Sequence, residues 1–164
     1  RLLYTPLDKE YGDMKVELYV DPTKMAGQGF GSATGQYMDV YIKFDTKTLT
    51  GYALRIIRTT KFSNAVDFLL MKYDHGKATP LTEPISSICY RTGCSIRLEV
   101  EKDVLSAHVE TETPLPPIRS AELTSKVDLD VRIDPNGFGG TGVQHTGSCG
   151  ESTTMLHALK VEWK

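Results

Sequence analysis

Residues 36–58, QYMDVYIKFDTKTLTGYALRIIR, decide the fold of this chain. Side chains alternate along the first half of this stretch, with Met38, Val40, Ile42 and Phe44 on one face and Tyr37, Asp39, Tyr41 and Lys43 on the other. A period of two predicts a β-strand that buries one face. A polar loop ends at Gly51, and residues 52–58 are largely apolar on both faces. We therefore predict two neighbouring strands, the second lying inside a sheet.

The same alternation recurs along the rest of the chain. It predicts further strands at residues 14–20, 66–72, 87–91, 94–100, 104–109, 127–133 and 155–163. No segment carries an apolar stripe of helical period over three turns. Short strands separated by turn residues predict an all-β protein, an antiparallel two-sheet jelly-roll sandwich. We expect residues 1–164 to form one such domain, with the Gly-rich stretches 26–35 and 134–151 as loops.

Composition and charge exclude several functional classes. The chain has 164 residues, of which 40% are hydrophobic and 24% charged, and its formal net charge is −2. Without a basic stripe, we expect no nucleic-acid partner. No apolar run approaches the roughly 20 residues needed to cross a bilayer, so we expect no membrane insertion. The chain begins at Arg1 and shows no signal peptide, and we expect a domain excised from a longer protein.

Three cysteines, Cys89, Cys94 and Cys149, are too few and odd in number for a disulfide framework. A bridge between Cys89 and Cys94 is geometrically possible but would close a very small loop. We predict three mostly buried thiols, and cysteine usage leaves the redox compartment open.

Four segments resemble the concanavalin A-like lectin/glucanase superfamily, which includes laminin G-like jelly-roll modules. They are GYALRIIR (51–58), VDFLLMKY (66–73), CSIRLEVEKDVLSAHV (94–109) and LHALKVEW (156–163). The resemblance lies in the order and alternation of the strands. It implies an extracytoplasmic module, of the kind often joined to glycan-processing enzymes, with a neighbouring domain of the same polypeptide as partner.

Asp128, Asp130 and Arg132 alternate along the predicted strand at 127–133. Glucanases of the resembled superfamily place a nucleophile and an acid/base carboxyl on one strand face. Here Arg132 holds the acid/base position and cannot donate a proton at neutral pH. We therefore name no catalytic residue, and predict either a charged, solvated strand face or part of a ligand-binding surface.

Tyr37, Asp39 and Tyr41 share a strand face, and Arg55 on the next strand lies beside them if the register allows. Carbohydrate sites pair an aromatic ring, which covers the apolar face of a sugar, with polar side chains that bind its hydroxyls. We predict that these four residues bind a glycan. The alternative is that the tyrosines are ordinary outward-facing strand residues.

The turn Asp134-Pro135-Asn136-Gly137 offers oxygen ligands. A structural calcium ion is common in the resembled superfamily, and Asp134 and Asn136 are the candidate ligands here. The same residues are also ordinary turn formers.

From these observations we predict a non-catalytic carbohydrate-binding or accessory module of an extracytoplasmic bacterial glycan-processing protein. Two alternatives remain open: a glycoside hydrolase of the same fold with an atypical site, and a structural spacer or protein-interaction module.

Overall fold

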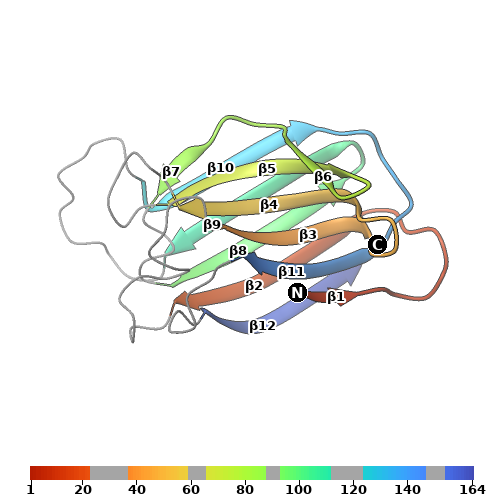
Figure 1. Cartoon of the computed structure of the whole chain (residues 1–164), viewed down its shortest axis with the longest axis horizontal. Coiled ribbons are helices and arrows are strands. Elements are labelled where there is room, and N and C mark those ends of the chain that lie inside the picture. Colours follow the sequence, from red (N-terminus) through yellow and green to blue (C-terminus); the bar gives the residue numbers. More distant parts are fainter. Residues whose placement is uncertain (23–36, 59–65, 88–92, 112–123, 147–153) are drawn as a thin grey trace.

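The computed structural model describes residues 1–22, 37–58, 66–87, 93–111, 124–146 and 154–164. Regular secondary structure in these ranges consists of β-strands, which form two antiparallel sheets (Figure 1). Sheet A contains, in spatial order, β1 (Leu2–Tyr4), β11 (Gly140–Thr146), β3 (Tyr37–Asp45), β4 (Thr50–Arg58), β5 (Val66–Asp74) and β6 (Lys77–Pro80), and β7 (Ile85–Ser87) also pairs with β5. Sheet B contains β10 (Lys126–Arg132), β9 (Val104–Thr111), β8 (Cys94–Glu101), β2 (Met14–Pro22) and β12 (Thr154–Trp163). The predicted antiparallel two-sheet jelly-roll sandwich is confirmed.

The two sheets stack face to face, with the strands of one running at a slant across those of the other (Figure 1). Twisted sheets pack in this way because side chains on the two inner faces interdigitate. β1 and β12, which are the edge strands of the two sheets, lie along the same border of the sandwich.

The core forms from the inward positions of both sheets. On sheet B these include Met14, Val16, Leu18, Val20, Ile96, Leu98 and Val100, and on sheet A they include Met38, Val40, Ile42, Leu54, Ile56, Phe68 and Leu70. Each such side chain, when fully buried, stabilises the fold by about 1.5–3 kcal/mol relative to exposure. Cys94 is also fully buried in this core, as predicted.

A β-bulge interrupts the alternation of β3. The register with β4 shifts between Ile42 and Asp45, and Lys43 adopts a φ of 50°. Gly51 stands opposite the bulge, where an added Cβ would lie 2.3 Å from the main-chain oxygen of Lys43. Only glycine therefore lets the two backbones approach this closely.

The bulge exchanges the faces predicted for the end of β3. Phe44 lies on the outer face of sheet A and stacks on Tyr41, with ring centroids 4.2 Å apart. The Lys43 side chain is buried instead, and its Nζ donates hydrogen bonds to the main-chain oxygens of Tyr11 and Gly12. The prediction that Phe44 faces the core and Lys43 faces solvent is wrong, because a strict period of two does not survive a bulge.

The Gly-rich stretch 134–151 is not wholly a loop, because part of it forms β11 between β1 and β3. At Gly140, an added Cβ would lie 2.1 Å from the main-chain oxygen of Phe44, and at Gly142 it would lie 2.2 Å from the main-chain oxygen of Leu2. These glycines serve close strand packing, which composition alone does not distinguish from loop flexibility.

Some sequence predictions lie outside the described residues. These are the Gly-rich stretch 26–35, residues 88–91 of the strand predicted at 87–91, and the thiols of Cys89 and Cys149. In the described part of the chain, no helix is long and apolar enough to cross a membrane.

Candidate functional site

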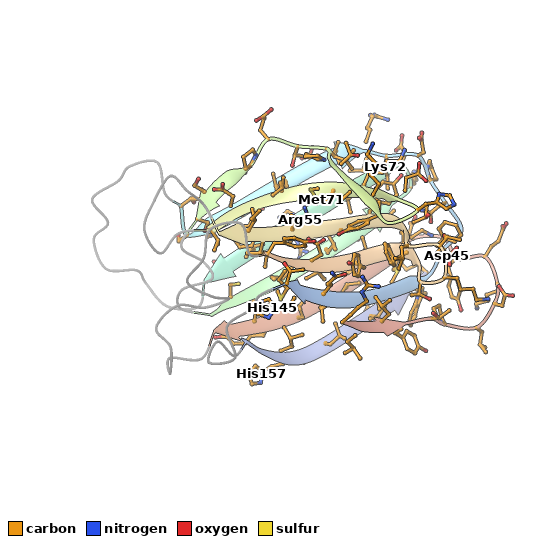
Figure 2. The ribbon with its side chains drawn as sticks, in the orientation of Figure 1. Asp45, Arg55, Met71, Lys72, His145 and His157 are labelled. Atoms are coloured by element: carbon orange, nitrogen blue, oxygen red, sulfur yellow. The ribbon has the colours of Figure 1, made fainter. Side chains whose placement is uncertain are left out.

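A charged and aromatic cluster lies on the outer face of sheet A. The register of β3 with β4 places Asp39 opposite Arg55, as the sequence prediction required. The Nε and Nη2 groups of Arg55 donate to the two carboxylate oxygens of Asp39, both at 2.8 Å. The guanidinium lies 3.9 Å from the ring centroid of Tyr37. Figure 2 shows Arg55 near the middle of this face. Three of the four predicted glycan-binding residues are therefore in direct contact.

Two residues that the sequence analysis did not name complete the cluster. The Tyr73 hydroxyl on β5 accepts from Arg55 Nη2 at 3.0 Å and donates to Asp39. The hydroxyl of Tyr41, the fourth predicted residue, donates to Gln144 Oε1 on β11 at 2.8 Å. Tyr73 lies one residue beyond the strand predicted at 66–72, in phase with its outward positions, because β5 extends to Asp74. Gln144 lies in a segment that the sequence analysis assigned to a loop.

Burial sets the protonation of this cluster. Asp39 is fully buried, and the Arg55 side chain is only 14% exposed. Burial opposes the charge of Arg55, but the hydrogen bonds and charge of Asp39 outweigh it and raise the Arg55 pKa. Burial and the neighbouring Asp39 carboxylate also raise the pKa of Tyr73. Arg55 is thus a cation and Tyr73 a neutral donor at neutral pH.

A desolvated ion pair of this kind adds little to stability, because the free energy lost when each ion gives up its hydration can exceed the attraction between them. Clusters of residues whose pKa values are strongly perturbed occur most often at functional sites. The Nη1 group of Arg55 and the Nε2 group of Gln144 form no hydrogen bond with the described residues. Within the described part of the chain, both donors are left without a protein acceptor.

A groove of about 530 Å³ crosses the outer face of sheet B. In the sheet register, Asp128 lies beside His108, His108 beside Arg97, and Arg97 beside Glu17, on four successive strands. All four residues line the groove, and Tyr19 forms part of its wall. His108 Nδ1 contacts a carboxylate oxygen of Asp128. Alternation predicted that these side chains face outward, but not that one row crosses the sheet.

The structure separates the three residues predicted on the strand at 127–133. Asp128 lines the groove, whereas Asp130 is exposed and lies outside the groove lining. Arg132 Nη1 donates to Asp103 Oδ2 at 2.7 Å and lies elsewhere on the surface. The described residues therefore place one of these two aspartates, not both, in the groove.

The candidate calcium ligands Asp134 and Asn136 form hydrogen bonds with other parts of the protein. Asn136 Nδ2 donates to the Lys43 oxygen at 3.2 Å, and Asn136 Oδ1 accepts from the Phe138 amide at 3.0 Å. The main-chain oxygen of Asp134 accepts from the Tyr52 hydroxyl at 2.8 Å. Across the described ranges, no group of three or more His, Cys, Asp or Glu residues is placed to hold a metal ion. The calcium site stays a prediction from the sequence.

Comparisons with known proteins match the fold rather than the sequence. No family model and no curated protein matches this chain. The carbohydrate binding module CBM66 from Bacillus subtilis is similar over 94% of this chain and 78% of its own, at 12% identity and a TM-score of 0.58.

Two further solved structures share the fold. The CBM2 module of the evolved Dit of Lactobacillus casei BL23 phage J-1 matches 98% of this chain and 65% of its own, at 8% identity and a TM-score of 0.51. The alginate lyase from Klebsiella pneumoniae matches 94% and 61%, at 14% identity and a TM-score of 0.54. This chain thus spans less than two thirds of the length of these two. At such identities the likeness is one of β-sandwich fold.

Proposed function

We propose that this chain is a non-catalytic carbohydrate-binding module of an extracytoplasmic bacterial glycan-processing protein, with a concanavalin A-like jelly roll. The observation that carries the proposal is the contact of Arg55 with both Asp39 and Tyr37 on the outer face of sheet A. Structural neighbours named as carbohydrate-binding modules support it, as does the resemblance of the strand order.

The cluster is suited to binding because it is already ordered. Asp39 and Tyr73 hold the guanidinium on one side and the Tyr37 ring covers its face, so Arg55 loses little conformational freedom when a ligand arrives. Its Nη1 group, with Nε2 of Gln144, donates to sugar hydroxyls. The partly exposed Tyr37 ring supplies apolar contact.

The two aspartates considered from the sequence as an acid/base pair do not share the groove on sheet B, and this separation favours binding over hydrolysis. A retaining mechanism needs two carboxyl groups about 5–5.5 Å apart across the scissile bond. On sheet A the Asp39 carboxylate is committed to Arg55 and Tyr73. On sheet B, Asp128 lines the groove without Asp130.

A glycan array followed by calorimetry tests the proposal, using wild type, Tyr37→Ala and Arg55→Lys. Arg55→Lys keeps the positive charge but loses the paired geometry and Nη1. We expect each variant to bind at least about tenfold more weakly, a change of about 1.4 kcal/mol. Tyr4→Ala is the matched control, because Tyr4 is 54% exposed on the edge strand β1.

Three results would count against the proposal. If Tyr37→Ala and Arg55→Lys both bind glycan with full affinity, the binding site is not on the outer face of sheet A. Turnover of any polysaccharide would support the glycoside hydrolase alternative. No retention of any glycan by the folded protein would support a spacer or protein-interaction module.

A further inference from the structure

The groove lies on the outer face of sheet B, on the opposite side of the sandwich from the Arg55 cluster. Its volume of about 530 Å³ lies within the range of about 300–1,000 Å³ typical of ligand pockets. Its floor comes from the central strands β9, β8 and β2, which are rigid elements of the sheet. A site on such a floor holds its side chains in a fixed arrangement.

Arg97 stands at the centre of this floor. None of the described residues forms a hydrogen bond or ion pair with its guanidinium, although His108 and Glu17 are its cross-strand neighbours. Every neighbouring carboxylate has another partner, as the contacts of the groove show. Glu110 contacts Lys126 at 3.4 Å, Glu17 contacts Lys15 at 3.5 Å, and Asp128 contacts His108.

This arrangement favours one kind of ligand chemistry. A guanidinium recognises a carboxylate through two parallel hydrogen bonds, a geometry that a neutral hydroxyl does not complete. Glu17, Glu110 and Asp128 also line the groove, and carboxylate oxygens can accept hydrogen bonds from hydroxyl groups.

We propose that the groove on sheet B binds a carboxylate-bearing sugar, a uronate unit of a glycan, with Arg97 binding its carboxylate. The acidic side chains around Arg97 accept hydrogen bonds from the hydroxyl groups of the sugar, and the ring of Tyr19 provides an apolar wall. Tyr19 is held in place from both sides: its ring meets His157 edge-on at 5.8 Å, and its hydroxyl lies over Gly93, where an added Cβ would approach to 2.4 Å.

Calorimetry with trimers of galacturonate, glucuronate and mannuronate tests this site. The methyl ester of each trimer is the matched ligand, because it keeps the sugar skeleton and removes the charge. We expect wild type to bind at least one acid trimer about 10- to 100-fold more tightly than its ester, the range for a charge-assisted pair. We expect Arg97→Gln to abolish this preference and Arg97→Lys to retain part of it.

Arg132→Gln is the control variant, because Arg132 lies on the same sheet but its side chain is 83% exposed and outside the groove. It should bind like wild type, and the melting temperature of Arg97→Gln should be unchanged. The proposal is overturned if wild type binds no acid trimer, if it binds acid and ester equally, or if Arg97→Gln binds the acid trimer like wild type.

The same titrations separate this inference from the proposed function. Tyr37→Ala and Arg55→Lys, which alter the opposite face, should leave binding of the acid trimer unchanged. Loss of that binding in these two variants, with Arg97→Gln unaffected, would place the uronate on sheet A and overturn the groove proposal alone.

Discussion

The Nζ of Lys43 lies 2.6 Å from the main-chain oxygen of Tyr11, and this contact ties the N-terminal segment to the end of the sandwich. A second hydrogen bond, of 2.7 Å, reaches the oxygen of Gly12. Lys43 is only 2% exposed, so its ammonium has exchanged water for two carbonyl groups. Burial lowers the pKa of this amine.

Lys43→Met should lower the free energy of unfolding by about 1–3 kcal/mol. Two carbonyl groups lose their donor, while removal of a buried charge offsets part of that loss. Urea unfolding at neutral pH measures the change. Lys77→Met, at an exposed position on β6, is the control. Equal stability of the two variants would show that the Lys43 contacts contribute nothing.

Removing one partner of the Asp39–Arg55 pair should be more damaging than removing both. Asp39→Asn leaves a desolvated guanidinium uncompensated, and we expect a loss of about 3–5 kcal/mol. Arg55→Gln should cost a similar amount, and the double variant should lose clearly less than the sum. Denaturant unfolding of all four proteins gives the coupling energy.

The exposed pair Arg132–Asp103, at 2.7 Å, is the matched control for that cycle. Solvent screens this pair, so its coupling energy should stay below about 1 kcal/mol. Equal coupling energies for the two pairs would contradict the argument from burial.

Stability should decline above about pH 10 because of Tyr73. Burial and Asp39 raise its pKa above the ordinary value of 10.0. Above pH 10 the unfolded chain loses this proton and the folded chain retains it, so the stabilisation is complete below that pH and is lost as the pH rises. Free energies of unfolding measured between about pH 8 and about pH 11 test this.

Tyr73→Phe is the diagnostic variant for the alkaline decline. It should be less stable than wild type at neutral pH, because Asp39 loses a donor. Its stability should fall less steeply above pH 10, since the raised pKa of Tyr41 still contributes. Parallel pH profiles for the two proteins would disprove the assignment.

Gly140→Ala should lower the free energy of unfolding by about 1–3 kcal/mol, the usual cost of overpacking. The added Cβ would lie 2.1 Å from the Phe44 oxygen, so β11 and β3 must separate. Gly137→Ala is the control, because the atoms nearest to its added Cβ belong to the flexible side chain of Glu10, with Cγ at 3.2 Å. Thermal unfolding distinguishes the two, and equal melting temperatures would refute the packing argument.

Gln144 and Arg97 illustrate why the candidate sites were only partly predictable. Gln144 joins the cluster because β11 lies between β1 and β3. The sequence analysis predicted a loop there because the segment is rich in glycine. Arg97 was recognisable as an outward residue, but its position between His108 and Glu17 depends on two strand registers. Register is a property of paired strands and leaves no mark on either strand alone.

The sequence by itself determined the two-layer architecture, because the burial of every second side chain is a local property of an extended chain. It also determined that Tyr37, Asp39 and Tyr41 share one face. The tertiary structure alone decided that Arg55 meets Asp39, and that a bulge turns Phe44 outward and buries Lys43. These outcomes depend on contacts between segments distant in the chain, where close approach and burial outweigh local preference.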